Sequence, residues 1–468
     1  MVEREASGGG ESAARGESVA APRRPVGLFA ALAALAISVG AAWQQEGLAH
    51  HLAGHRLRAM AQPLERLKLQ TLTFQRTAFE SDRMLPVYGS SELFCCGASY
   101  RPSRIFASEP TGFNAFSIGM PGAGDLLFAL SLGALGKAIE GKKVVVIDSP
   151  PWFFNRNGIN PGWYIGLFSS EIAYMFIFEA PISLELREIA ARRMLDYPKT
   201  LEPHPLLRAA VRELADPTPL HLATYHALRP LGRLAAWIER VNDASQTRRF
   251  VHRHKSWKPV PYPYRRTLDW VGVTTEATQL AERNDTTNPF GFPDDSFQQM
   301  VKKEQGRVQQ AIAVYRSGGT NRDGRLLPEP PDWTAEMQAS VEWTDLRLVI
   351  GILRELGAHP LIVGLPMPGP YDDYTELSPR LRRVFYDRWD AAVRGTGIPW
   401  VDLRDADEDP FFLTDSGAHL SPRGWVFADR MLDMFWHGST IDEMRAELTT
   451  LAEQVPAPAV RVTRVVAP

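Results

Sequence analysis

Cysteine is nearly absent from this chain of 468 residues, and its two cysteines, Cys95 and Cys96, are adjacent. A disulfide framework or a cysteine-based zinc site needs spaced cysteines, so the sequence excludes both. No pair of histidines or cysteines has the spacing of metal ligands, and we expect neither a metal nor another cofactor. Burial as small apolar residues accounts best for the two thiols, with a reactive role as the alternative.

An excess of charge of either sign is also lacking, because the formal net charge is −2. Surfaces that bind nucleic acid need clustered lysine and arginine, so we exclude nucleic acid as a partner. The composition, 44% hydrophobic and 23% charged, is that of a globular protein and excludes fibrous and wholly disordered classes. The length allows one large domain with insertions or two domains.

One long uncharged run stands near the N-terminus. Residues 1–24 are rich in glycine, alanine, serine and charge, which predicts a disordered cytoplasmic tail. Residues 25–43 carry no charge and have about the length that crosses a hydrocarbon core. Because arginines precede this run, we predict a single-pass anchor in the cytoplasmic membrane with everything downstream outside. A signal peptide cleaved near Val39 and Ala41 is the alternative, and it exports the domain as well.

The rest of the chain alternates between strand and helix patterns. A juxtamembrane helix is predicted over residues 44–80, a largely helical insertion over about 155–330, and a C-terminal tail over 441–468. The predicted strands are Leu85–Tyr88, Asn114–Gly122 with its terminal glycine turn, Lys143–Asp148, Pro360–Leu365 and Pro399–Leu403. The predicted helices are Asp125–Ile139, Trp343–Leu356, Ser378–Arg394 and Pro422–Trp436. Such alternation predicts an α/β fold, a parallel sheet with helices on both faces.

Residues capable of chemistry follow the first and the last of these strands. Gly89, Ser90 and Ser91 end the first strand, and Asp415 and His419 follow the last. The carboxyl ends of parallel strands meet at one edge of the sheet, so we expect these side chains to lie together. Serine becomes a nucleophile when a histidine removes its proton and an acid holds the other ring nitrogen. We therefore predict Ser91 as nucleophile, His419 as base and Asp415 as acid.

Each assignment has an alternative. The serines could simply turn the chain, and His419 could cap the following helix. Glu92 is expected to make a structural hydrogen bond at the turn rather than to transfer protons. The backbone amide of Ser91 and the glycine turn at Gly122 are candidate donors to an oxyanion. Other acids near the histidine are Asp402, Asp405, Asp407 and Asp409.

Several blocks of sequence resemble known proteins. They are Gly89-Ser90-Ser91-Glu92-Leu93, Ser117-Ile118-Gly119-Met120-Pro121-Gly122, Ser149-Pro150-Pro151-Trp152-Phe153, Leu365-Pro366-Met367-Pro368-Gly369, Tyr371-Asp372-Asp373-Tyr374-Thr375 and His419-Leu420-Ser421-Pro422-Arg423-Gly424-Trp425. Together they resemble the SGNH/GDSL hydrolase superfamily and, within it, the DltD family. The resemblance implies a three-layer α/β/α flavodoxin-like fold over residues 81–440, with Ser91 as nucleophile and His419 as base.

The chain departs from the superfamily pattern in two ways. Asp415 lies four residues before the histidine instead of three, and the third-block asparagine has no match near Asp148. Ser90 also stands where many relatives carry aspartate. We expect the oxyanion and substrate-binding residues to be Gly122, Ser90, Ser149 and Trp152.

The resemblance further implies an exported serine acyltransferase or esterase that acts on an acyl ester, D-alanyl by preference. The acceptor would be an envelope polymer such as teichoic acid, lipopolysaccharide or exopolysaccharide. The implied partners are a multi-pass membrane acyltransferase and a D-alanyl or acyl carrier protein. Two alternatives stay open: a polysaccharide O-acetyl esterase or transferase with the same triad, and a scaffold for a membrane acyltransferase that performs no chemistry itself.

Overall fold

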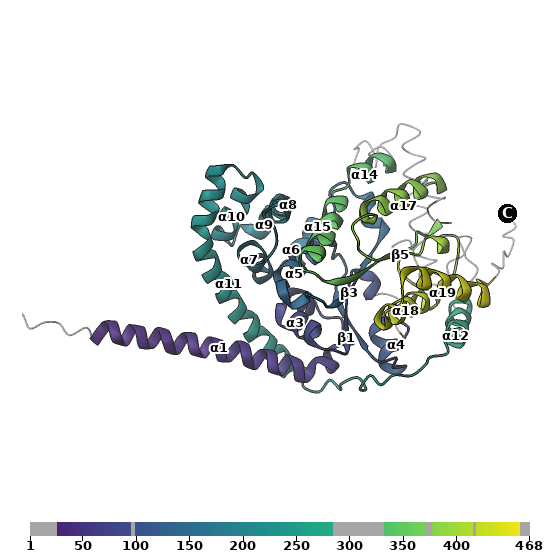
Figure 1. The fold of residues 1–468 in the computed structure, drawn as a ribbon, viewed down its shortest axis with the longest axis horizontal. Helices are drawn as coiled ribbons and strands as arrows, with labels where there is room; N and C mark the ends of the chain where they lie inside the picture. Colours follow the sequence, from purple (N-terminus) through teal and green to yellow (C-terminus); the bar gives the residue numbers. More distant parts are fainter. Residues whose placement is uncertain are drawn as a thin grey trace, which may run out of the picture.

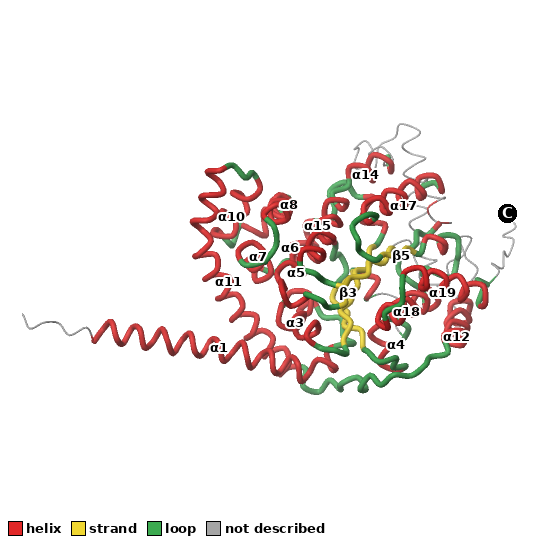
Figure 2. The backbone as a smooth tube through the Cα atoms, viewed as in Figure 1, coloured by secondary structure: helices red, strands yellow, loops and turns green. Residues whose placement is uncertain are grey.

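The computed structural model describes residues 26–94, 99–283, 332–369, 372, 377–414 and 418–458. At its centre lies a parallel sheet of five strands in the order β2-β1-β3-β4-β5 (Figures 1 and 2). The strands are β1 Met84–Gly89, β2 Asn114–Gly119, β3 Lys143–Asp148, β4 His359–Gly364 and β5 Trp400–Asp402. The predicted α/β fold with a parallel sheet is confirmed, and the strand order is that of a doubly wound sheet.

Both faces of the sheet are buried, which explains the continuous apolar runs of its strands. Along β3, Val144 and Val146 belong to one hydrophobic core, whereas Val145 and Ile147 belong to a second. Successive side chains of a strand point to opposite faces, so these two cores lie on the two sides of the sheet. Helices cover both sides, with α5 and α15 on one and α4, α18 and α19 on the other (Figure 1).

Of the helices around the sheet, α5, α15, α17 and α18 lie where helices were predicted, whereas α4 and α19 were not predicted. Their bounds are α4 Pro102–Ser108, α5 Asp125–Leu135, α15 Glu342–Glu355, α17 Pro379–Val393, α18 Pro422–His437 and α19 Ile441–Gln454. The described part of the segment between β3 and α15 is largely helical, apart from residues 254–269, which contain no helix. Its helices are α6 Pro161–Leu167, α7 Ser170–Phe178, α8 Leu184–Leu195, α9 Pro198–Leu201, α10 Pro205–Ala215, α11 Pro219–Arg253, α12 Trp270–Arg283 and α14 Trp333–Ala339.

The segment expected to be a C-terminal tail contains α19 instead. Thr440 and Glu443 form a capping box at its start, each side chain accepting the backbone N–H of the other residue. Met444, Leu448 and Leu451 then recur at helical spacing and are buried in the second core. The capping box and the apolar spacing after it are the local sequence signals that specify this helix.

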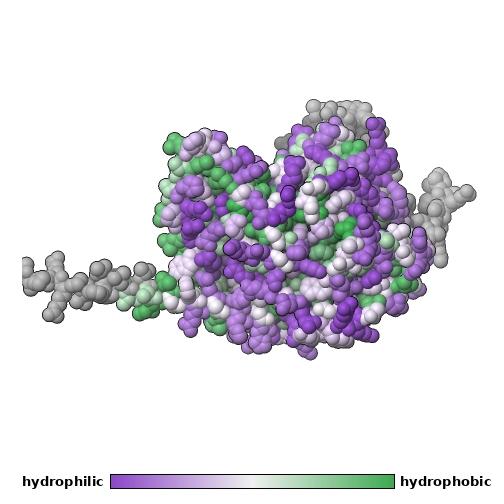
Figure 3. Space-filling model, viewed as in Figure 1, coloured by the Kyte–Doolittle hydropathy of each residue, from purple (hydrophilic) through white to green (hydrophobic). Residues whose placement is uncertain are grey.

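The N-terminal region also differs from expectation. A single helix, α1, runs from Val26 to Met60 and is followed by two short helices, α2 Arg66–Gln70 and α3 Leu72–Glu80. Among the helices whose residues are described, none combines the length and the hydropathy that crossing a membrane requires. Residues 1–25 and several side chains between 26 and 35 lie outside the description, so the anchor over 25–43 stays a prediction. Along α1, Ile37 and Trp43 are exposed. Figure 3 shows hydrophobic residues at the surface where the N-terminal part of the chain extends from the globular part.

Candidate active site

The structure brings the predicted nucleophile and base together across 328 residues of sequence. The Nε2 atom of His419 lies 2.8 Å from the Oγ atom of Ser91. Ser91 opens a short 3-10 helix, η1 Ser91–Leu93, directly after β1. As the first residue of a helix, it has a backbone N–H without an acceptor inside that helix. The arrangement lets the ring nitrogen take the hydroxyl proton while the serine attacks.

Close packing of two strand ends shapes the turn before Ser91. A Cβ atom on Gly119 would lie 1.8 Å from the carbonyl oxygen of Gly89, so β1 and β2 can meet here only through glycine. The buried carboxylate of Glu92 accepts a hydrogen bond from the Ser90 backbone N–H. Burial raises the pKa of Glu92, and that hydrogen bond and the nearby His419 counteract the rise. The predicted structural role of Glu92 at the turn is confirmed.

A tight loop holds His419 in place. Leu413 and Leu420 form an antiparallel bridge, and the Thr414 backbone N–H donates to the carbonyl oxygen of His419 over 2.8 Å. Ala418 has a φ of 58°, and it is the one non-glycine residue with positive φ in the described part of the chain. Such a conformation costs of order 1–3 kcal/mol and persists only where the surroundings impose it. The strained residue stands directly before the candidate base.

The residues after His419 support this loop rather than contact the serine. Ser421 caps α18 by accepting the Gly424 backbone N–H over 3.1 Å. Arg423 is buried and pairs with Asp409 over 2.8 Å. A Cβ atom on Gly424 would lie 2.3 Å from the carbonyl oxygen of Phe412, so α18 packs against the loop without a side chain in between. This sequence block therefore anchors the histidine loop to α18.

The predicted acid, Asp415, lies outside the described residues, and its role stays a prediction. Three of the four alternative acids are bonded elsewhere. Asp409 pairs with Arg423, and Asp402 accepts two hydrogen bonds from Arg404, of 2.6 and 2.8 Å. Asp407 accepts a hydrogen bond from the hydroxyl of Tyr386 over 2.5 Å. The fourth, Asp405, is exposed. Cys95 and Cys96 also lie outside the described residues.

Two of the residues proposed for oxyanion and substrate binding lie at neighbouring strand ends, Gly122 after β2 and Ser90 after β1. The buried Gly122 has a φ of 86°, which suits glycine, and a Cβ atom there would lie 2.7 Å from the ring of Trp163. The hydroxyl of Ser90 donates to the carbonyl oxygen of Met120 over 3.5 Å, a long and weak hydrogen bond. The glycine turn therefore lies next to the residue that precedes Ser91.

The other two lie at the end of β3. Ser149 is buried and precedes a 3-10 helix, η3 Pro150–Phe154, that contains Trp152. Within the described residues, neither Ser149 nor Trp152 is hydrogen-bonded to Ser91 or His419. The ring of Trp152 packs edge-on against Trp163, with 6.0 Å between ring centroids. Their assignment to substrate binding stays a prediction.

Trp163 is a residue that sequence reasoning missed. It belongs to α6, it is 53% exposed, and it touches both Gly122 and Trp152. An exposed aromatic ring beside a glycine turn forms a wall against which a substrate can pack. No local pattern identifies it, because both contacts are made by residues from other strand ends.

Buried carboxyl groups lie behind the glycine turn. Glu342 accepts the Asp125 backbone N–H over 3.0 Å at the start of α5. Burial, followed by the charge of the neighbouring Asp345, raises the pKa of Glu342 to about 8. Burial also raises the pKa of Asp148 to about 7, and a hydrogen bond of 2.7 Å from the indole of Trp389 opposes that rise.

These shifts predict how stability depends on pH. The pKa of Glu342 is higher in the folded chain than in the unfolded chain, so the folded state binds more protons between about pH 4.5 and 8. The raised pKa of Glu342 therefore contributes its whole stabilising effect below pH 4.5, and this effect is lost as the pH rises to 8. One proton amounts to about 1.4 kcal/mol per pH unit. We expect Glu342→Gln to flatten this part of the profile in urea unfolding at pH 5, 6.5 and 8.

The matched control is Glu453→Gln, which removes an exposed carboxylate on α19. This control should leave the pH dependence of the free energy of unfolding as it is in the unmodified protein. Equal slopes in the Glu342→Gln variant and the unmodified protein would contradict the assignment of this pH dependence to Glu342.

Comparison with known proteins identifies the family of this chain. The model of the DltD protein family matches residues 61–437, which is more than half of the chain. Protein DltD of Bacillus subtilis (strain 168) is 25% identical over 414 residues, covering 88% of this chain and 96% of that protein. Protein DltD of Staphylococcus aureus is 22% identical over 378 residues, with coverages of 80% and 87%, respectively. Protein DltD of Lacticaseibacillus rhamnosus is 24% identical over 361 residues, with coverages of 76% and 78%. This chain belongs to the DltD family.

Proposed function

We propose that this protein is a serine acyltransferase or esterase of the SGNH type that acts on a D-alanyl ester of an envelope polymer. The polymer would be a teichoic acid, a lipopolysaccharide or an exopolysaccharide. One observation carries the proposal: the hydrogen-bonding distance of 2.8 Å between Ser91 Oγ and His419 Nε2. Membership of the DltD family supports the choice of the acyl group.

The reaction would proceed in two steps through an acyl-enzyme. In the first, Ser91 Oγ attacks the carbonyl carbon of an acyl ester or thioester while its proton moves to His419 Nε2. The amides of Ser91 and Gly122 would stabilise the oxyanion, and Asp415 would hold the other ring nitrogen. The leaving oxygen or sulfur takes the proton from His419 as its bond to the acyl carbon breaks.

In the second step, His419 removes a proton from the incoming nucleophile, which attacks the acyl carbon of the acyl-enzyme. His419 then gives that proton to Ser91 Oγ as the bond between this oxygen and the acyl carbon breaks. A polymer hydroxyl as nucleophile gives transfer, and water gives hydrolysis. The two outcomes differ only in which nucleophile reaches the acyl-enzyme first.

We place the reaction outside the cytoplasmic membrane, with the chain held there by an N-terminal anchor over residues 25–43. The exposed Ile37 and Trp43 on α1 are compatible with contact to lipid. The proposed partners are a multi-pass membrane acyltransferase and a carrier protein that supplies the activated acyl group.

The test replaces Ser91 in the full chain, expressed in cells that lack the natural protein. Ser91→Ala should lower ester-linked D-alanine on the envelope to the level of the deletion strain, because the nucleophile is missing. The matched control is Ser108→Ala, which removes an exposed hydroxyl on α4 that bonds only within its own helix. Unchanged D-alanine in the Ser91→Ala strain would refute the proposal.

Two further readouts separate the alternatives. Loss of O-acetyl groups, with D-alanine unchanged, would indicate the acetyl-ester function. Failure of a serine-reactive fluorophosphonate probe to label Ser91 in the purified chain would indicate a scaffold without chemistry.

A further inference from the structure

A pocket lies at the free edge of the sheet. It has a volume of about 520 Å³ and is enclosed by β5, the end of α17, α18 and α19. This volume is within the range of small-molecule sites. We call it the edge pocket. Three residues of its wall, Asp409, Phe412 and Arg423, belong to the structure that supports the His419 loop, but Ser91 and His419 do not line it.

The floor of the edge pocket is apolar. Five of its side chains are buried and belong to the second hydrophobic core, namely Val401, Leu403, Phe412, Phe427 and Leu448. The charged groups near this floor are neutralised within the protein. Arg404 binds Asp402 through two hydrogen bonds, and Arg423 binds Asp409. A ligand that reaches the floor therefore meets hydrocarbon and paired charges.

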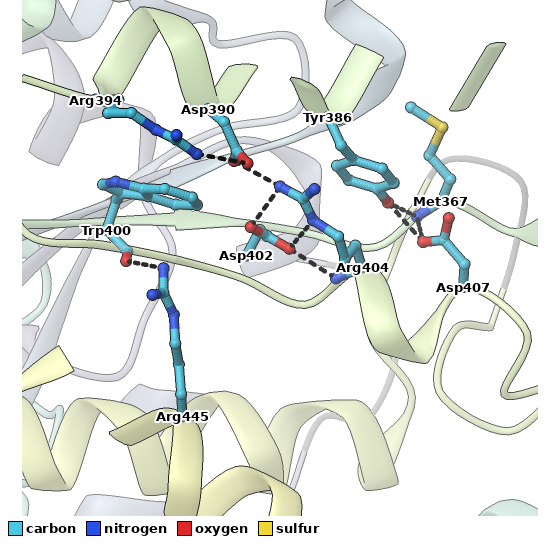
Figure 4. Close-up of polar contacts among 9 residues, drawn as sticks. All are labelled: Met367, Tyr386, Asp390, Arg394, Trp400, Asp402, Arg404, Asp407 and Arg445. Atoms are coloured by element: carbon cyan, nitrogen blue, oxygen red, sulfur yellow. Dashed lines mark hydrogen bonds and ion pairs between the residues drawn. The ribbon is translucent and has the colours of Figure 1, made fainter. Parts of the chain in front are cut away.

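The mouth of the pocket carries cations. Arg394 and Arg445 lie on either side of Trp400 (Figure 4). The side chain of Arg394 is 75% exposed, and its contact with Asp390 is 3.8 Å long. The guanidinium of Arg445 lies 4.9 Å from the centre of the Trp400 ring and 3.4 Å from the carbonyl oxygen of the same residue.

The acid beside Arg394 is already engaged, because Asp390 accepts a closer hydrogen bond of 2.5 Å from Arg404 (Figure 4). Asp405 is the one exposed acid among the residues that line the pocket. Both arginines of the mouth have N–H groups that face solvent, and a guanidinium binds carboxylate or phosphate oxygens in pairs. The mouth is therefore suited to an anion.

We propose that the edge pocket binds an anionic amphiphile. Its aliphatic chain would lie on the floor formed by Leu403, Phe427 and Leu448, and its phosphate or carboxylate head would lie between Arg394 and Arg445. Burial of apolar surface favours entry of the aliphatic chain of the ligand into the pocket. The two guanidinium groups bind its anionic head at the mouth of the pocket. The site is independent of the proposed acyl chemistry, and Ser91→Ala should leave it intact.

The test is calorimetric titration of the full chain in nanodiscs with hexyl phosphate. Hexanoate, hexanol and inorganic phosphate are titrated in parallel, so that the head group and the chain are varied separately. We expect one hexyl phosphate per chain, with hexanol and inorganic phosphate binding about tenfold more weakly or worse. The titration with hexanoate shows whether a carboxylate head can replace the phosphate head. If hexanol bound as tightly as hexyl phosphate, the proposed role of the anionic head would be overturned. If inorganic phosphate bound as tightly as hexyl phosphate, the proposed role of the aliphatic chain would be overturned.

Two variants locate the site. Arg445→Gln should weaken hexyl phosphate about tenfold, because it removes a charged donor. Ala452→Trp places an indole at the pocket wall on an exposed position of α19 and should abolish the binding. The matched controls are Arg383→Gln on α17 and Ala446→Trp on α19, exposed residues that do not line the pocket. Binding that survives Ala452→Trp, or that both control variants lose, would overturn the proposal.

Discussion

Replacing either Ser91 or His419 by alanine is expected to lower the hydrolysis of a D-alanyl thioester by the purified chain about 10⁴-fold or more. Each variant removes one side of the 2.8 Å contact on which the proposed acyl transfer depends. Without His419 the hydroxyl keeps its proton, and without Ser91 the base has no nucleophile to activate. Single-turnover rates of the two variants and of the unmodified protein provide the measurement.

The double variant makes this test sharper. When two residues depend on each other in one catalytic step, replacing the second causes no further loss of rate once the first is gone. The double variant Ser91→Ala with His419→Ala should therefore react no more slowly than either single variant. His359→Ala, an exposed histidine at the start of β4, should keep the rate within about twofold. Rates that fall multiplicatively in the double variant would show that the two side chains act separately.

The sequence was sufficient to predict the sheet because each strand is short, apolar and bounded by turn residues. The strand over Lys143–Asp148 has the predicted bounds, and its side chains alternate between two cores. Once a parallel sheet was inferred, topology alone placed the end of β1 and the segment after β5 at one edge. The proximity of Ser91 and His419 followed from that placement.

Features that depend on contacts distant in sequence could not be predicted. Trp163 meets Gly122 only because α6 folds back over the turn, and no local pattern records this. The edge pocket arises where α19 packs beside β5, and the helix itself was expected to be a tail. Local periodicity identifies elements, whereas the cavities between them are determined by how they pack.

A buried ion pair between two helices illustrates the same limit and gives the largest expected effect on stability. Arg193 of α8 donates two hydrogen bonds of 2.8 Å to the two carboxylate oxygens of Asp345 in α15, across 152 residues of sequence. The side chain of Asp345 is fully buried, and that of Arg193 is 6% exposed. The pair therefore joins a helix of the segment after β3 to a helix that covers the sheet.

Asp345→Leu should lower the free energy of unfolding by about 3–5 kcal/mol, because it removes the carboxylate that accepts two hydrogen bonds from the buried guanidinium of Arg193 and leaves only the contact with Asp196. Adding Arg193→Met to the same chain should recover most of this loss, since the second change removes the incompletely paired charge. Urea unfolding of the two single variants and the double variant gives the coupling between the residues. A double variant as unstable as the sum of the two single variants would mean that packing volume, rather than the incompletely paired charge, accounts for the loss. Recovery would instead mean that this ion pair specifies how α8 docks on α15 while adding little net stability of its own.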